Sequence, residues 1–196
     1  GFSVAWQGTD GNDEVEGGTS IWQGIRAMAP DAELSHDGSA ADAARHRVAV
    51  VVIGERPYAE GMGDVRPPGV KVKRGSSLTT TGAGGMHPYG TTLEHAVSHP
   101  EDLAVLQRIA EAGIPIVTVL VSGRPLVVNP EFEASDAFVC AWLPGSEGDG
   151  VAEVLFGQHP FRGKLSFSWP RDDAQNPNRG DGSDPLFPYG YGLTLD

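Results

Sequence analysis

Three carboxylates stand close together in one short segment of the chain. They are Glu55, Glu60 and Asp64, with Tyr58 between the first two. Carboxyl groups held near one another can act as general acid and general base, because burial and a neighbouring charge decide which of them keeps its proton. The same residues would also suit an ordinary solvated loop, since acidic side chains are mostly exposed. This segment is therefore the first place to look for chemistry.

The element that must position these carboxylates is the apolar run that precedes them. Val48–Ile53 is short, rich in β-branched residues and continuously apolar, which predicts a strand buried on both faces in a parallel sheet. Ligands of such sheets collect beyond the carboxyl ends of the strands. Gly54, Pro57, Gly61 and Gly63 shape the loop that follows, because they permit or fix unusual backbone angles.

The rest of the chain alternates between predicted helices and strands. A capping residue at Thr19 or Ser20 opens the first helix, and Ser98 with Glu101 forms a capping-box pattern that opens a longer helix ending at Gly113. Helices are expected at 21–28, 40–45, 98–112 and 151–156, and strands at 34–36, 48–53, 115–121, 137–143 and 164–169, with a further short element at 126–128. This order predicts an α/β fold, a mostly parallel sheet sandwiched between helices, whose strand-end loops share one edge.

Composition limits the classes of partner. The chain has 196 residues, 39% hydrophobic and 20% charged, which suits one globular domain with its own core. Its net charge of −12 would repel nucleic acid and anionic membranes, and the short basic patch at Lys71, Lys73 and Arg74 is expected to be a solvated loop. No stretch is long and apolar enough to cross a bilayer. We expect neither nucleic acid nor membrane as a partner.

Other chemistry-bearing residues give no sign of a cofactor. Cys140 lies in an apolar run and is expected to be a small buried hydrophobe. The glycine run at 82–85 lacks the Lys-Ser/Thr of a phosphate loop, and 145–148 does not have the Gly-x-Ser-x-Gly order of a nucleophile elbow. The six histidines show no convincing ligand spacing. We expect no metal and no cofactor.

Four motifs, in order along the chain, carry a resemblance to a known family. They are Gly-Glu-Arg-Pro-Tyr-Ala-Glu-Gly-Met-Gly-Asp64, Ser122-Gly-Arg-Pro-Leu, Ala141-Trp-Leu-Pro-Gly-Ser-Glu-Gly and Phe187-Pro-Tyr-Gly-Tyr-Gly-Leu193. They resemble the C-terminal α/β sandwich domain of family 3 glycoside hydrolases, in the β-glucosidase and exo-β-glucanase branch. The resemblance implies one such domain over residues 1–196, with a loop insertion at about 66–92.

The resemblance also implies a function. A separate barrel domain would supply the nucleophile of a retaining β-glucosidase, and this chain would supply the general acid/base, which falls on Glu60. Trp6 resembles the tryptophan that stacks on a sugar, and Tyr58 is a second candidate for substrate contact. The substrate would be a β-glucoside or a β-glucan oligosaccharide, with a periplasmic or secreted location. Without the barrel, this chain alone is expected to be inactive.

Other residues of these motifs have expected structural roles, and alternatives stay open. Glu55 is expected to bind backbone amides, Asp64 to organise the loop, Arg124 to tie the strand-end loops together through carboxylates, and Ser146 with Glu147 to cap a helix. The family's first strand has no counterpart before Trp6, so we expect one piece of a split or nicked enzyme, or an incomplete domain. The insertion is expected to border an outer sugar subsite or a subunit contact in a possible oligomer. A non-catalytic carbohydrate-binding or interaction module on the same scaffold is the alternative.

Overall fold

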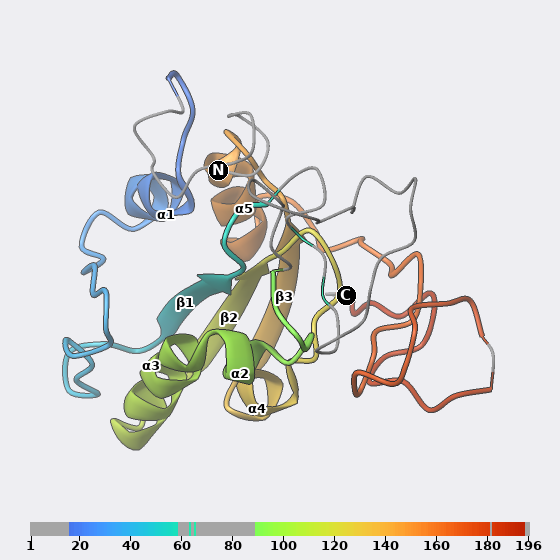
Figure 1. Cartoon of the computed structure of the whole chain (residues 1–196). Coiled ribbons are helices and arrows are strands. Elements are labelled where there is room, and N and C mark those ends of the chain that lie inside the picture. The colour runs from blue at the N-terminus through green and yellow to red at the C-terminus, as the bar shows by residue number, and fades with distance from the viewer. Residues whose placement is uncertain (1–15, 59–62, 64, 66–88, 181, 195–196) are drawn as a thin grey trace, which may run out of the picture.

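The computed structural model describes residues 16–58, 63, 65, 89–180 and 182–194. Within them, one sheet holds three parallel strands in the order β1 (Ala49–Gly54), β2 (Ile116–Val121) and β3 (Ala137–Trp142) (Figure 1). The helices are α1 (Ile21–Met28), α2 (His95–Ser98), α3 (Pro100–Glu111), α4 (Asn129–Glu133) and α5 (Gly148–Leu155). The predicted α/β fold with a parallel sheet flanked by helices is confirmed. The expectation that the family's first strand is missing before Trp6 falls on residues 1–15, which lie outside the described residues.

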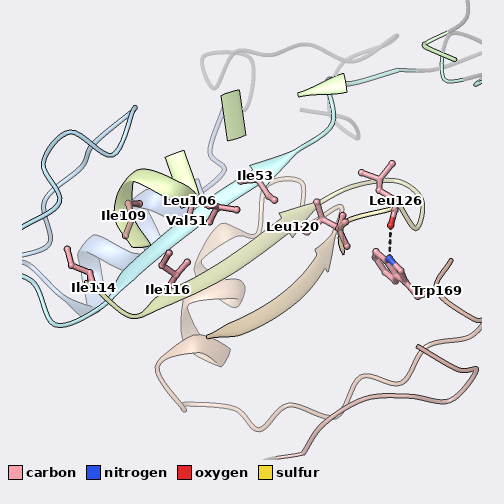
Figure 2. Packing of buried hydrophobic residues seen from close by; sticks show 10 residues of the cluster. Val51, Ile53, Leu106, Ile109, Ile114, Ile116, Leu120, Leu126 and Trp169 are labelled. Atoms are coloured by element: carbon pink, nitrogen blue, oxygen red, sulfur yellow. Dashed lines mark hydrogen bonds between the residues drawn. The ribbon is translucent and has the colours of Figure 1, made fainter. Parts of the chain in front are cut away.

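The core lies between the sheet and α3. Val51 and Ile53 of β1 and Ile116 and Leu120 of β2 pack into one buried cluster with Leu106 of α3 (Figure 2). The burial of alternate residues along β1 is the pattern expected of a strand covered well on one face. In the same figure the Trp169 indole N–H donates to the carbonyl oxygen of Leu126, at 2.6 Å, which joins the C-terminal segment to this core.

The prediction that β1 is buried on both faces is wrong. Val52 is 46% exposed and Val48, just before the strand, is also exposed. Among the described residues β1 pairs with β2 alone, so it forms an edge of the sheet. A groove of about 1100 Å³ runs along this edge, from Trp22 of α1 to Glu55 at the carboxyl end of β1. The groove follows the open edge of the sheet and is not confined to the strand ends.

Local hydrogen bonding and backbone geometry explain where the observed helices agree with or differ from the predicted ones. Ser20 forms a full capping box with Gln23, which confirms the start of α1. The predicted helix at 40–45 is a set of turns, because the Asp42 carboxylate binds the amide of Ala44 (2.9 Å) and competes with helical bonding. The predicted start of α3 at Ser98 is wrong: Pro100 disfavours helical geometry at His99, whose ψ is 63°, and so separates α2 from α3.

Ser146 and Glu147 do not cap α5 as expected. Their side chains bond to each other at 3.0 Å, and no side-chain cap is formed at Glu147. Instead, the amide of Gly148 donates to the carbonyl oxygen of Thr19, at 2.8 Å. The start of α5 is thus satisfied by the segment that leads into α1, and the two helices pack on each other.

Three of the short segments predicted from sequence form little sheet structure. Residues 34–36 have no strand partner, so that prediction is wrong. The segment at 164–169 contributes only an antiparallel bridge between Trp169 and Phe187, and the one at 126–128 only a bridge between Val127 and Glu94. No helix in the described part of the chain has the length and apolar character needed to cross a membrane.

Candidate functional site at the carboxyl ends of the strands

Glu55 is the first residue after β1, and parallel strands bring the segment after β2 to the same edge. The Glu55 amide continues the ladder by donating to the carbonyl oxygen of Val121, at 3.2 Å, which fixes where its side chain begins. The Glu55 carboxylate is almost fully buried. Its Oε2 accepts from the hydroxyls of Ser122 (2.6 Å) and Tyr58 (3.1 Å), and its Oε1 accepts from Arg124 Nε (2.7 Å). Side chains, not the expected backbone amides, hold this carboxylate.

Arg124 occupies the centre of the site. Its Nη2 lies 2.7 Å from Glu55 Oε1, and its Nη1 donates to the carbonyl oxygen of Gly63. The guanidinium lies 4.4 Å from the centre of the Tyr58 ring and 5.0 Å from that of Tyr89, so cation–π contacts add to the ion pair. Arg124 therefore links the segment after β1, the segment after β2 and the start of the segment that leads to α2.

Tyr89 brings a third segment to the same edge. Its hydroxyl accepts from the amide of Arg56 at 2.8 Å and lies 2.9 Å from His99 Nε2. Burial raises the pKa of Tyr89 and, together with the Glu55 charge, that of Tyr58, so both phenols stay protonated. Burial and the neighbouring His95 lower the pKa of His99. Nε2 of a neutral His99 can accept a hydrogen bond from the Tyr89 hydroxyl, which completes the chain of hydrogen bonds from Arg56 to His99.

A second polar cluster lies behind this one, between α2, α3 and α4. His95 Nε2 lies 2.9 Å from Asp102 Oδ2, which also accepts weakly from the Gly54 amide at 3.4 Å. His95 and Glu131 are almost fully buried, and His95 Nδ1 and both Glu131 oxygens have no hydrogen-bond partner. Burial raises the pKa of Glu131. The sequence analysis missed this cluster, although the spacing of His95, His99 and Asp102 by four and three residues was a usable signal.

The structure unites only part of the predicted site. It brings together Glu55, Arg124 and Tyr58, whereas Trp6, Glu60 and Asp64 lie outside the described residues. Sequence reasoning did not select Ser122, Tyr89 or His99, which complete the network. Tyr89 lies near the carboxyl end of the insertion predicted at about 66–92, and a parallel bridge between Val65 and Gly90 joins the chain near the two ends of that insertion.

The described residues offer little for metal or thiol chemistry. No group of three or more His, Cys, Asp and Glu side chains among them is arranged to hold a metal ion. Burial raises the pKa of the Cys140 thiol to about 11, so it is protonated at neutral pH and is a poor nucleophile.

Known proteins with solved structures are similar to this chain in fold. An exo-1,3/1,4-beta-glucanase from a Pseudoalteromonas species has a similar structure, with a TM-score of 0.77 and 44% identity over 98% of this chain and 22% of that chain. A β-glucosidase from Listeria innocua, at 24% identity and a TM-score of 0.60 over 90% of this chain and 26% of that chain, shares the fold.

Sequence comparison agrees with the structural one. A lysosomal beta glucosidase from Dictyostelium discoideum is 29% identical over 99% of this chain and 24% of its own length. The chain thus spans about a quarter of the length of these relatives. Residues 3–195 match the family described as the glycosyl hydrolase family 3 C-terminal domain, and the chain belongs to this family.

Proposed function

We propose that this chain is part of a retaining, exo-acting β-glucosidase or β-glucan glucohydrolase and supplies its general acid/base, Glu60. A barrel domain, on a separate chain or on another part of the same one, supplies the nucleophile. Support comes from the family and from relatives that are named β-glucosidases and a β-glucanase. The substrate class that follows is a β-glucoside or a β-glucan oligosaccharide.

The observation that carries the proposal is the network at the carboxyl ends of β1 and β2. The residues on either side of the segment 59–62, Tyr58 and Gly63, are both bound to Arg124 or Glu55. The two residues that flank this segment are thus held at the edge of the sheet where ligands of parallel α/β proteins collect. Glu55 is saturated with three side-chain partners, so it is poorly suited to exchange protons with a substrate.

The chemistry requires one carboxylate that attacks the anomeric carbon and one carboxylic acid that protonates the leaving oxygen, about 5 Å apart. Glu60 would donate its proton in the first step and remove a proton from water in the second. Closure of the barrel against this edge would bury the acid and so raise its pKa toward neutral pH. Trp6 would offer its ring face to the C–H groups of a sugar, and Tyr58 would contribute a substrate contact beside its bond to Glu55.

Glu60→Ala in the complete enzyme tests the proposal. We expect kcat/KM for phenyl β-glucoside to fall by roughly 10²–10⁴-fold, because this leaving group needs a proton. Added azide should restore turnover with 2,4-dinitrophenyl β-glucoside by attacking the glycosyl-enzyme, and the product should be β-glucosyl azide. Glu111→Ala, an exposed residue at the far end of α3, is the matched control and should keep wild-type rates. Near-normal hydrolysis of the phenyl glucoside by Glu60→Ala would refute the assignment.

A further inference from the structure

Arg124 contacts the chain on both sides of the segment 59–62. On the amino side, the guanidinium lies against the Tyr58 ring and pairs with Glu55, which also binds the Tyr58 hydroxyl. On the carboxyl side, Nη1 donates to the carbonyl oxygen of Gly63. One planar group thus fixes the two ends of a four-residue segment relative to each other.

The two ends also touch directly, which leaves little freedom for Arg124 to move. A Cβ atom placed on Gly63 would lie 2.2 Å from Cδ2 of Tyr58, and one on Gly123 would lie 2.8 Å from the Tyr58 hydroxyl oxygen. Both positions therefore need glycine for the ring to pack as it does. A Tyr58 ring enclosed between Gly63, Gly123 and Arg124 keeps the guanidinium in one orientation.

Lysine at position 124 could not reproduce this arrangement. The guanidinium uses Nε toward Glu55, Nη1 toward Gly63 and its flat faces toward Tyr58 and Tyr89. An ammonium group is a compact point charge without a planar fork, so it could keep the ion pair but not the bond to Gly63 and the stacking together. Arg124→Lys therefore preserves the charge and removes the positioning.

We infer that Arg124 is a positioning residue for the general acid/base, acting by holding Tyr58 and Gly63 at the two ends of the segment that carries Glu60. The inference rests on the proposed function. It assigns to Arg124 no contact with substrate and no proton transfer. Its effect is on the step that needs a correctly placed proton donor, and an error of about 1 Å in such a placement can cost 10²-fold in rate.

The test compares two substrates with Arg124→Lys in the complete enzyme. Cleavage of phenyl β-glucoside needs protonation of the leaving oxygen, whereas 2,4-dinitrophenolate leaves without it. We expect kcat/KM to fall by roughly 10²-fold for the phenyl glucoside and by less than about threefold for the dinitrophenyl glucoside. The ratio of the two values is independent of the fraction of folded enzyme, so a general loss of structure cannot produce this result.

Controls separate this inference from the proposed function. Arg108→Lys, which makes the same chemical change on an exposed arginine of α3, should leave the ratio unchanged. If Glu60→Ala leaves the ratio unchanged, the proposed function fails. If Glu60→Ala changes the ratio but Arg124→Lys does not, only the positioning role is refuted. Should Arg124→Lys not fold, Glu55→Gln decides in the same way, because it weakens the ion pair that orients Arg124.

Discussion

Glu131 offers the sharpest test of the physical reasoning, because its carboxyl group is buried without a hydrogen-bond partner. The raised pKa means that the folded protein binds the Glu131 proton more tightly than the unfolded chain does. Ionisation of Glu131 should therefore leave the free energy of unfolding unchanged at pH values below 4.5, the pKa of the carboxyl group in the unfolded chain. Above pH 4.5 the free energy of unfolding should fall as pH rises, until the carboxyl group of the folded protein ionises as well.

Glu131→Gln removes the ionisation while keeping the shape of the side chain. Burying a charged carboxylate without a partner costs more than burying a neutral carboxyl or amide group in the same place. We therefore expect the variant to unfold with a free energy larger by about 1–3 kcal/mol at pH 8 and close to that of wild type at pH 4. For a chain of this length, each kcal/mol corresponds to roughly 2–4 °C in Tm.

Thermal unfolding followed by circular dichroism from pH 4 to pH 9 measures the difference. Glu133→Gln is the matched control, because Glu133 lies in the same helix and is exposed, and it should shift Tm by less than about 1 °C at every pH. If Glu131→Gln is less stable than wild type at pH 8, the buried carboxylate is charged and favourably paired. The reasoning from its orphaned oxygens would then be wrong.

Three further predictions concern packing. Gly24→Ala should lower the free energy of unfolding in urea by about 1–3 kcal/mol, because the added Cβ would lie 2.8 Å from the backbone of α5. Gly150→Ala is the control: its Cβ would meet no atom within 4 Å, so it should be neutral or stabilising. Cys140 should react with a disulfide reagent at pH 8 far more slowly in the native protein than in urea, since the thiol pKa is about 11; equal rates would contradict its burial. Replacing 67–87 with a Gly/Ser linker of about twelve residues should leave Tm within a few degrees of the wild-type value. The reason is that a parallel bridge joins Val65 to Gly90, and a linker of this length can connect its two strands. Unfolding of the variant would show that the insertion supports the core.

Local signals determined much of the architecture. The apolar runs that form β1, β2 and β3 are short and bounded by charged residues, glycine, serine or proline, and their predicted bounds agree with the structure within one or two residues. Ser20 and Gln23 specified the start of α1 through bonds between residues three apart. Because parallel strands end at one edge, the sequence also predicted that Glu55 and Arg124 would lie in neighbouring strand-end loops, as the ion pair between them shows.

The tertiary structure decided the features that depend on residues far apart. Whether an apolar run is covered on both faces depends on which elements pack against it, so the exposure of Val52 could not be read from β1 alone. Tyr89 joins the site because the chain returns to this edge near the end of the long insertion, and Glu131 is buried where α4 packs against α3. Capping boxes and turns are set by bonds between near neighbours, which the sequence displays directly. The burial and charge environment of a side chain are set by segments that meet only in the folded protein.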